Sequence, residues 1–292
     1  MLRKAIPRTA AIHDLSGFGR SSLTTIIPIL STMGIQVCPL PTAVLSTHSK
    51  FPNYQFVDLT SSMRGFIDHW KDLKIDFDAI YSGFLGSPEQ IDIVGNFIQD
   101  FSHADQLVIV DPVLGDDGAL YPPLPPQMIQ EMKRLIRQAD IITPNITEAA
   151  LLLDKPYNAT IRQEEIKNWI LELSANGPDT VIITSIPPEG SKQQKTAVIA
   201  HSKQDGRFWK VSCDYIPANY PGTGDAFTSV ITGCLLQGDS LPTALDRAVQ
   251  FISIAIRATF GHRDYHTNEG IMLERVLDNL KAPVVMSSYE LV

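Results

Sequence analysis

The feature that most limits the fold of this chain is the alternation of short apolar runs with longer amphipathic segments. Runs rich in apolar and β-branched residues predict strands at residues 9–13, 78–83, 107–111, 139–143 and 180–185. Between two of them, residues 126–138 place Met128, Met132 and Leu135 on one side of a predicted helix that begins after prolines. Strands that alternate with helices predict an α/β fold, in which helices cover a mostly parallel sheet.

The C-terminal third predicts a hairpin followed by two helices. Residues 196–200 and 207–212 lie on either side of an Asp-Gly turn, and two helical segments follow from Asp225 onward. No internal repeat or low-complexity linker interrupts the chain, so we expect a single domain over residues 1–281. Residues 282–292 show no periodicity and are expected to form a peripheral tail.

Composition and charge restrict the class of protein. A chain of 292 residues with 44% apolar side chains can bury a substantial core. Its longest apolar runs, such as residues 251–256, fall far short of the ~20 residues that cross a bilayer. The net charge of −8 disfavours nonspecific binding to nucleic acid or to an anionic membrane. We therefore expect neither nucleic acid nor a membrane as a partner.

The N-terminal segment and the cysteines indicate the compartment. The apolar stretch near the N-terminus is interrupted by His13 and Asp14, so a secretory signal is not expected. Cys38, Cys213 and Cys234 are odd in number and widely spaced, which favours reduced thiols over disulfides or a zinc site. These features predict a cytoplasmic protein.

Polar residues follow nearly every predicted strand. In an open parallel sheet, ligands bind beyond the carboxyl ends of the strands, where loops lead into helices. Each polar residue taken alone can be a helix cap or a turn residue, but the series favours a binding site. The series comprises Asp14, Ser16, Ser82, Gly83, Asp111, Thr143, Asn145, Thr184 and Ser185.

The segment PGTGDAF, residues 221–227, places two glycines and an aspartate before a predicted helix. The glycines allow a tight turn, after which the N–H groups of Thr223, Gly224 and Asp225 can converge on an anion. We expect Gly224 to need a positive φ that a β-branched residue resists. Asp225 can accept the proton of an attacking hydroxyl, as aspartates do in kinase chemistry. An ordinary helix cap remains the alternative for this motif.

The segment at residues 14–22 contains G-x-G-x-x-S after a strand, but it does not predict a dinucleotide site. Such a site needs an acidic residue about 20 positions further on, and none lies between Asp14 and Asp58. The chain also lacks the G-x-x-x-x-G-K-[ST] phosphate loop. An NAD enzyme and a P-loop NTPase are therefore disfavoured.

Two further segments carry candidate ligand groups. Pro112 holds Asp111 in an extended conformation at a strand end, where an aspartate can hold a cation. The connection from Asp116 to Tyr121 is polar and flexible in composition, which fits either a lid over phosphates or a solvated loop. Glu148, one turn into a predicted helix, either balances the helix dipole or orders metal-bound water.

In this chain the segments DPVLGD, ITPNxxE, VIITS and PGTGDAF, taken together, resemble the ribokinase-like superfamily, and more closely its pyridoxal kinase branch. The resemblance covers residues 10–260 and implies a ribokinase-like three-layer α/β/α sandwich. It also implies ATP-dependent phosphorylation of the 5′-hydroxymethyl group of pyridoxal, pyridoxine or pyridoxamine. ATP, Mg²⁺ and K⁺ are the implied cofactors, and a homodimer is the implied assembly.

The resemblance assigns roles residue by residue. It makes Asp225 the catalytic base, with an anion hole formed by Gly222, Thr223 and Gly224. The implied substrate-binding residues are Asp14, Ser16, His48, Ser49, Gly83 and Phe84. The implied nucleotide-binding residues are Asp116, Tyr121, Asn145, Glu148, Thr184, Ser185, Gly222 and Gly224. The implied metal-binding residues are Asp111, Thr143, Glu148 and Thr184.

Two departures from the family pattern concern the substrate pocket. Phe84 stands where pyridoxal kinases often have a tyrosine, and Thr47 stands where an asparagine is common. A hydroxymethylpyrimidine kinase of thiamine synthesis is the alternative, although DPVLGD favours the pyridoxal kinases. A sugar or nucleoside kinase is disfavoured because no small β-lid domain precedes Tyr54. A non-catalytic ligand-binding protein with the same fold is a further alternative, which the intact GTGD disfavours.

Overall fold

The structure is a computed structural model that describes residues 5–187, 195–262, 264–282 and 288–292. Its strands are β1 (Arg8–Ser16), β2 (Gln36–Leu45), β3 (Phe56–Asp58), β4 (Ala79–Ser82), β5 (Leu107–Val110), β6 (Gly115–Asp116), β7 (Ala119–Leu120), β8 (Ile141–Ile142), β9 (Thr180–Ile186), β10 (Lys195–Ser202), β11 (Arg207–Asp214) and β12 (Tyr289–Leu291). Its α-helices are α1 (Leu23–Thr32), α2 (Thr60–Asp72), α3 (Pro88–Asp100), α4 (Gln127–Leu135), α5 (Ile146–Leu152), α6 (Gln163–Ala175), α7 (Thr223–Gln237) and α8 (Leu241–Phe260). Short 3-10 helices lie at Ile136–Gln138, Thr267–Glu269, Leu273–Arg275 and Leu277–Lys281.

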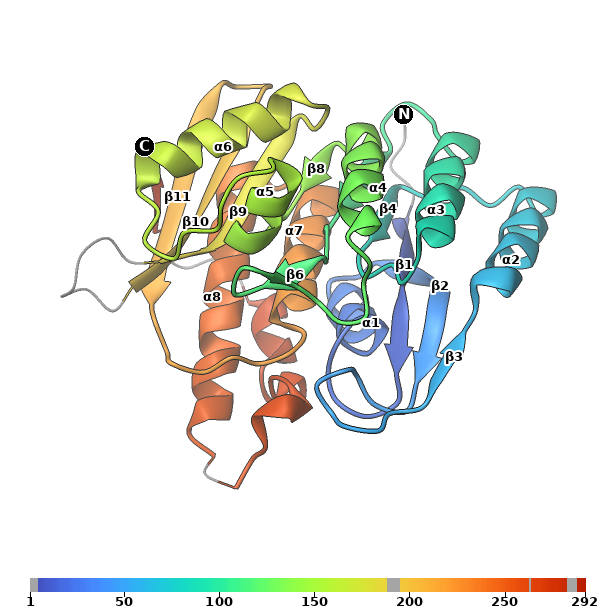
Figure 1. Cartoon of the computed structure of the whole chain (residues 1–292), viewed down its shortest axis with the longest axis horizontal. Coiled ribbons are helices and arrows are strands. Elements are labelled where there is room, and N and C mark those ends of the chain that lie inside the picture. The colour runs from blue at the N-terminus through green and yellow to red at the C-terminus, as the bar shows by residue number, and fades with distance from the viewer. Residues whose placement is uncertain (1–4, 188–194, 263, 283–287) are drawn as a thin grey trace.

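One ten-stranded sheet runs through the molecule in the order β12-β11-β10-β9-β8-β5-β4-β1-β2-β3. The pairings from β2 through β1, β4, β5 and β8 to β9 are all parallel. Antiparallel strands extend both ends of this block, β3 at one end and β10, β11 and β12 at the other. The predicted α/β fold with a mostly parallel sheet is confirmed (Figure 1).

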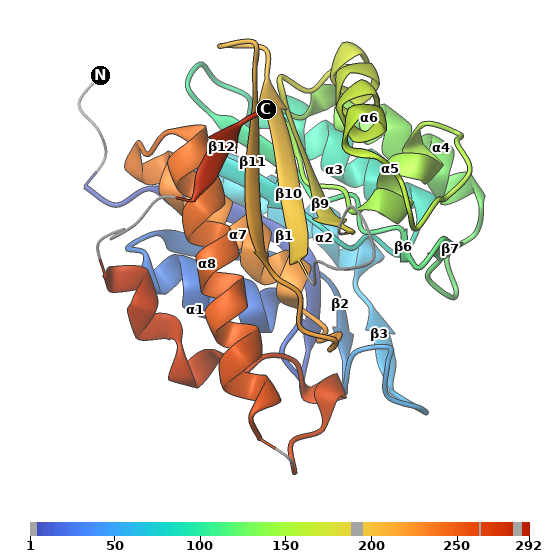
Figure 2. The same ribbon diagram turned by 90° about the vertical axis from the view of Figure 1, so that its left-hand side faces the viewer.

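Helices cover both faces of the sheet, which makes three layers. Helices α2 to α6 lie on one face, and α1, α7 and α8 lie on the other (Figure 2). Successive strand residues face opposite layers: Ile80 of β4 packs in the core under α2 to α6, and Tyr81 packs in the core under α1, α7 and α8. Both faces of the central strands are therefore buried, which explains their continuous apolar runs.

The elements that the sequence predicted are present with small changes at their ends. The five predicted strands are β1, β4, β5, β8 and β9, the hairpin is β10–β11, and α8 spans the predicted residues 241–260. The sequence did not predict β2, which contains Pro39 and Pro41. Because β3 pairs only with Ala43–Leu45 of β2, the prolines lie where β2 has no partner on that side and need no N–H donor.

The C-terminal tail supplies a strand that the sequence pattern did not predict. Residues 289–291 form β12 at the sheet edge and pair with β11, while residues 283–287 of the predicted tail lie outside the described residues. The division into a domain and a tail at residue 281 stays a prediction. Among the residues that the structure describes, no helix is long and apolar enough to span a membrane.

Candidate active site

The turn before α7 is formed by Gly222, which adopts a left-handed conformation with φ of 79°. A Cβ atom at this position would lie 2.2 Å from the carbonyl oxygen of Arg20, so a side chain does not fit. Gly224 lies within α7 and has no positive φ, so the expectation that Gly224 needs one is wrong. A Cβ on Gly224 would contact only the Asp111 carboxylate, at 3.8 Å. Gly222 makes the turn, and Gly224 leaves space above Asp111.

The first turn of α7 presents three backbone donors. The first hydrogen bond of the helix runs from the Ala226 N–H to the Gly222 carbonyl, at 2.9 Å. In the part of the chain that the structure describes, the N–H groups of Thr223, Gly224 and Asp225 have no acceptor. These donors lie at the positive end of the helix dipole, so they suit an anion such as a phosphoryl group.

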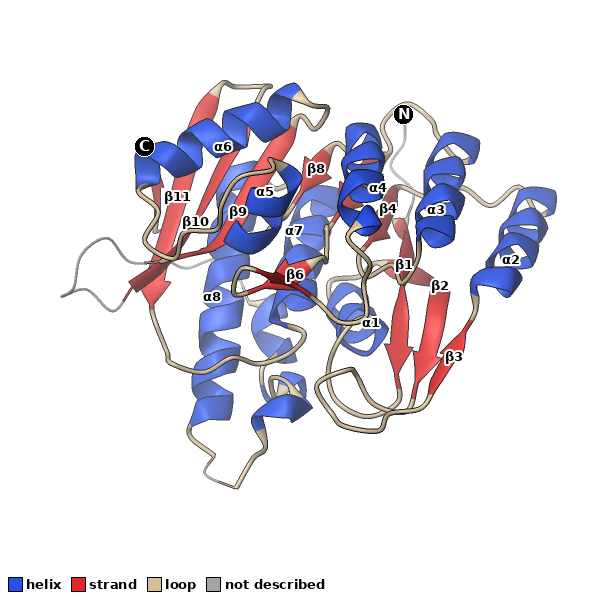
Figure 3. Cartoon of the chain, viewed as in Figure 1, coloured by secondary structure: helices blue, strands red, loops and turns tan. Residues whose placement is uncertain are grey.

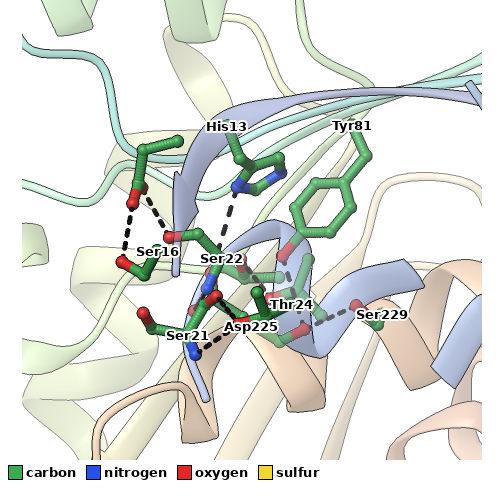
Figure 4. Close-up of polar contacts among 11 residues, drawn as sticks. His13, Ser16, Ser21, Ser22, Thr24, Tyr81, Asp225 and Ser229 are labelled. Carbon is green, nitrogen blue, oxygen red and sulfur yellow. Dashed lines mark hydrogen bonds and ion pairs between the residues drawn. The ribbon is translucent and has the colours of Figure 1, made fainter. Parts of the chain in front are cut away.

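The carboxylate of Asp225 projects from this turn and is held by a neighbouring loop. Its Oδ2 atom accepts a hydrogen bond from the Ser22 N–H at 2.7 Å, and its Oδ1 atom lies 3.9 Å from Nδ1 of His13 (Figure 4). Burial raises the pKa of Asp225 to about 6; the bond from Ser22 opposes this rise, and the charge of Asp14 adds to it. Asp225 is therefore a carboxylate at neutral pH and can take up a proton.

Ser22 connects this carboxylate to a second one. The Ser22 hydroxyl donates to Oδ1 of Asp14 at 2.6 Å, and the Ser16 hydroxyl approaches Oδ2 of Asp14 at 3.4 Å. Ser22 has a strained backbone for a residue other than glycine, with φ of 50° and ψ of −131°. The structure thus brings two predicted substrate residues, Asp14 and Ser16, to the predicted base.

His48 is buried with both ring nitrogens engaged by the backbone. Nδ1 accepts a hydrogen bond from the Lys50 N–H at 3.3 Å, and Nε2 lies 2.5 Å from the Asn268 carbonyl oxygen. These partners assign the proton to Nε2, and burial lowers the pKa of His48, so the ring is neutral. Its contact with a substrate would therefore use the ring face or edge. Ser49, the next predicted substrate residue, is exposed.

Gly83 and Phe84 follow the end of β4. Gly83 is buried directly against the ring of His13, and Phe84 is half-buried and packs on the core beneath α2 to α6. The aromatic face predicted at Phe84 is therefore supported from one side by the core.

Two buried carboxylates lie behind the α7 turn. Burial and the negative charge of Asp225 raise the pKa of Asp111 to about 8. Burial and the charge of Asp111 raise the pKa of Glu148 well above its usual range. Thr143 and Thr228 both contribute hydroxyls near Asp111, and the Thr228 hydroxyl donates to that of Thr143 at 3.0 Å. A cation would relieve the repulsion between these carboxylates.

Glu148 is fixed by the start of α5. It forms a capping box with Asn145, whose side chain accepts from the Glu148 N–H at 2.9 Å, while Glu148 Oε2 accepts from the Asn145 N–H at 2.8 Å. The other oxygen of Glu148 accepts from the Leu114 N–H at 3.2 Å. Thr184 is joined to the same loop through the Pro144 carbonyl, at 3.0 Å. Ser185 beside it is exposed, with a positive φ of 58°.

The segment from Asp116 to Tyr121, predicted as a polar connection, contains regular structure. It forms a hairpin of β6 and β7, drawn in Figure 3 as a small ribbon apart from the main sheet. Asp117 and Gly118 both have positive φ, as the tightest hairpin turns require, and the Gly118 N–H donates to the Thr147 hydroxyl at 3.0 Å. A lid function of this hairpin stays a prediction. Burial raises the pKa of Tyr121, and the nearby charge of Glu148 adds to this rise.

The predicted metal ligands form no complete cluster of acidic or imidazole ligands. Over the described ranges, no group of three or more His, Cys, Asp or Glu side chains could hold a metal ion. Asp111 and Glu148 are the two carboxylates of the predicted set, and Thr143 and Thr184 add hydroxyl oxygens. This all-oxygen set has the chemistry that hard cations prefer, with part of the coordination left to other ligands.

A large hollow on the described surface lies at the opposite edge of the sheet, at the amino ends of the strands. Seven aspartates line it, and three of them have clear roles in the fold. Asp78 accepts from the Arg8 N–H at 2.8 Å, Asp140 accepts from the Val108 N–H at 2.7 Å, and Asp179 pairs with Lys203 at 3.5 Å. We therefore place the active site at the carboxyl ends, where the free N–H groups of the α7 turn adjoin the Asp225 carboxylate.

Sequence reasoning missed two residues of the site, His13 and Ser22. Ser22 ends the G-x-G-x-x-S pattern, which was examined only as a dinucleotide fingerprint. His13 precedes Asp14 inside an apolar strand, where a histidine carries no distinctive signal. Only the structure shows that its ring faces Asp225.

Comparison with known proteins agrees with this geometry. A family model described as phosphomethylpyrimidine kinase matches residues 67–269. A pyridoxine/pyridoxal/pyridoxamine kinase of Bordetella avium is 31% identical over 257 residues, which cover 83% of this chain and 82% of the relative. The crystal structure of pyridoxal kinase from Lactobacillus plantarum has 30% identity and a TM-score of 0.85, with 94% of this chain and 97% of that chain covered.

A second similar structure is that of a Bacteroides thetaiotaomicron protein designated a phosphomethylpyrimidine kinase, in a crystal form with pyridoxal. It has 57% identity and a TM-score of 0.95, and the match covers 98% of this chain and 100% of that chain. Our chain therefore belongs to the phosphomethylpyrimidine kinase family of ribokinase-like enzymes. Within this family it is a kinase of the pyridoxal kinase branch, so the resemblance drawn from its motifs is confirmed.

Proposed function

We propose that this enzyme transfers the γ-phosphoryl group of ATP to the 5′-hydroxymethyl group of pyridoxal, pyridoxine or pyridoxamine. The observation that carries this proposal is the first turn of α7, where three free backbone N–H groups adjoin the ionisable carboxylate of Asp225. A site that binds the phosphoryl group and a group that accepts the proton are thereby placed together at the start of one helix. The Bacteroides protein crystallised with pyridoxal, at 57% identity, supports a B6 vitamer as the substrate.

In the mechanism, Asp225 takes the proton of the attacking hydroxyl as the new O–P bond forms. The bond between the γ-phosphorus and the bridging oxygen breaks in the same step, and ADP leaves with that oxygen. The N–H groups of Thr223, Gly224 and Asp225 bind the oxygens of the transferring group, on which negative charge is spread. Asp14 and Ser16 lie within one side-chain network of the base and would orient the vitamer. We assign six further residues to the proposed nucleotide site: Asp116, Tyr121, Asn145, Glu148, Thr184 and Ser185.

We propose Mg²⁺ and a monovalent cation, K⁺, as cofactors. Burial raises the pKa of Asp111 and of Glu148, with the charge of Asp225 adding to the first and that of Asp111 to the second, and the hydroxyls of Thr143 and Thr184 complete an oxygen-rich donor set. This set fits hard cations, and Mg²⁺ would neutralise phosphate charge when bound. The requirement is tested by turnover after treatment with a chelator, followed by return of Mg²⁺ with and without K⁺.

We also propose that the enzyme acts as a cytoplasmic homodimer. The support is the resemblance to pyridoxal kinases and, for the compartment, the cysteine pattern. Light scattering on the purified protein tests the assembly, since a mass near twice 32.3 kDa is expected. Cell fractionation tests the compartment.

The function is tested by ATP-dependent ADP release with pyridoxal, pyridoxine, pyridoxamine and hydroxymethylpyrimidine as separate acceptors. Turnover is expected on the vitamers, and Asp225→Asn should lower kcat by at least about 100-fold with little change in the KM for ATP. The asparagine keeps the shape of the side chain and removes the base. Turnover on the pyrimidine alone would assign the enzyme to thiamine synthesis, and turnover on none of the four would refute the proposed substrate class.

A further inference from the structure

His13 is a buried histidine of unusual position. Its side chain has no exposed surface, and neither ring nitrogen has a hydrogen-bond partner of ordinary geometry among the described residues. The backbone of Tyr81 lies near the ring and partly offsets the lowering of its pKa by burial. Leaving a buried polar group unpaired destabilises the folded state, so an unpaired imidazole needs a reason beyond packing. The polar side chain it faces is Asp225, at 3.9 Å from Nδ1 to Oδ1 (Figure 4).

The surroundings of His13 fix the direction of its ring. The Tyr81 ring meets it edge to face, with centroids 4.4 Å apart. On another side lies Gly83, where a Cβ atom would come within 2.4 Å of Nδ1, so the glycine leaves just enough room for the imidazole. The ring therefore cannot turn away from Asp225 without displacing the end of β4.

The path of β1 explains why the ring reaches this place. The pairing of β1 with β2 shifts register between His13 and Leu15, where two steps along β1 face three steps along β2, from Pro41 to Val44, so the extra residue of the bulge lies in β2. A bulge re-aims consecutive side chains next to active sites. Opposite this bulge, Asp14 contacts the Ser22 hydroxyl and His13 faces the Asp225 carboxylate, so both residues belong to the same small network.

The two carboxylate oxygens of Asp225 make different contacts in this network. Oδ2 is held by the Ser22 N–H at 2.7 Å, whereas Oδ1 has His13 as its neighbour at a distance longer than a hydrogen bond. Catalytic hydrogen bonds are often long without substrate and shorten in the reacting complex. A movement of about 1 Å would let an Nδ1–H group donate to Oδ1.

We infer that His13 is a positioning residue, whose neutral imidazole orients the free carboxylate oxygen of Asp225 toward the substrate hydroxyl. This inference rests on the proposed function, in which Asp225 is the base. Burial lowers the pKa of His13 to about 3, below that of Asp225, so the substrate proton stays on Asp225 and His13 acts only through it. His13 touches neither ATP nor the vitamer in this role.

The test compares three full-length variants in the vitamer assay. His13→Leu removes the donor at similar volume, His13→Asn places an amide N–H close to the Nδ1 position, and Asp225→Asn reports the loss of the base itself. For His13→Leu we expect kcat to fall by about 10- to 100-fold while the KM values for ATP and vitamer stay within twofold. His13→Asn should recover most of the lost kcat.

The outcomes separate positioning from packing. A His13→Leu enzyme with wild-type kcat would overturn the inference, as would a loss of kcat that His13→Asn shares fully. Thermal melting of both variants shows whether they fold. If kcat falls in both variants in proportion to a fall in melting temperature, the positioning role of His13 is also rejected. If the wild type phosphorylates no vitamer, the proposed function itself fails. If Asp225→Asn is inactive and both His13 variants are fully active, the proposed function stands and only the inference on His13 fails.

Discussion

At the scale of single residues, the site depends on how burial changes the proton affinity of carboxylates. Asp225 must be ionised to accept a proton, and its pKa is raised to about 6 by burial. We therefore expect kcat/KM for the vitamer to be constant above neutral pH and to fall about tenfold per pH unit below pH 6. Initial rates from pH 4.5 to 9 measure this pH dependence of kcat/KM, and circular dichroism at each pH checks that the fold is intact. A profile that stays flat down to pH 5 would contradict the prediction.

Asp111 gives a second prediction, on stability. Its pKa rises from 3.8 to about 8 on folding, because burial and the charge of Asp225 disfavour ionisation. The folded state thus holds a proton that the unfolded state releases, so the stabilising contribution is complete below pH 4 and is lost as the pH rises to 8.

The variant Asp111→Asn lacks this titration. In buffer without nucleotide or divalent cation, the melting temperature of the wild type should fall from pH 5 to pH 8 by more than that of Asp111→Asn. The difference should be several degrees, since each unit of pKa shift is about 1.4 kcal/mol and each kcal/mol is about 2–4 °C for a large domain. Equal slopes for the two proteins would show that Asp111 does not titrate in this range.

The residues of the site were only partly predictable from the sequence. Asp225, Asn145 and Glu148 were predicted because they lie at helix starts, where the local pattern defines their position. His13 was missed because its role depends on a register shift between β1 and β2 and on Asp225, more than 200 positions away. A long-range contact of this kind leaves no periodic signal in one sequence.

At the scale of elements, the N-terminus of α7 contains two glycines that are needed for different reasons. Gly222→Ala must place a methyl group 2.2 Å from the Arg20 carbonyl at a positive φ, so we expect a loss of stability of about 1–3 kcal/mol and a fall in turnover. Gly224→Ala meets no backbone and gains helix propensity, so its stability should be unchanged or slightly higher.

Turnover of Gly224→Ala should nevertheless fall, because its methyl group enters the space above Asp111 where the phosphoryl group is proposed to bind. Thermal melting and steady-state kinetics of the two variants measure both effects. Normal kcat in a stable Gly224→Ala enzyme would place the phosphoryl group elsewhere.

The elements themselves were predicted where burial on both faces gives a continuous apolar run, as in β4, β5 and β9. Strands at the ends of the sheet obey other rules. In β2 the edge tolerates prolines, and β12 has no buried residue, so neither shows the pattern of a strand in its sequence. Their pairing is set by partners that lie far away in the chain.

At the scale of the whole molecule, the tail and the active site belong to different parts of one sheet. Strand β12 lies at one end of the strand order, while β1, β4, β5 and β8, which carry the site, lie toward the middle and the other end. The tail is nevertheless attached by specific contacts. Ser288 donates twice to the buried Asp246 carboxylate, at 3.0 and 2.6 Å, and the Tyr289 ring meets Trp209 with centroids 5.6 Å apart.

Truncation after residue 282 should therefore lower stability and leave catalysis unchanged. Loss of the β12 pairing and of the Ser288 bonds should cost about 1–3 kcal/mol, because one oxygen of buried Asp246 loses its donors, while Asp246 keeps its bond from Gln250 at 2.8 Å. Ser288→Ala is the matched control, and it should show part of the loss in melting temperature with the full kcat. If the truncated enzyme melts like the wild type but loses turnover, the tail takes part in the reaction, and the boundary at residue 281 does not separate the kinase from a peripheral segment.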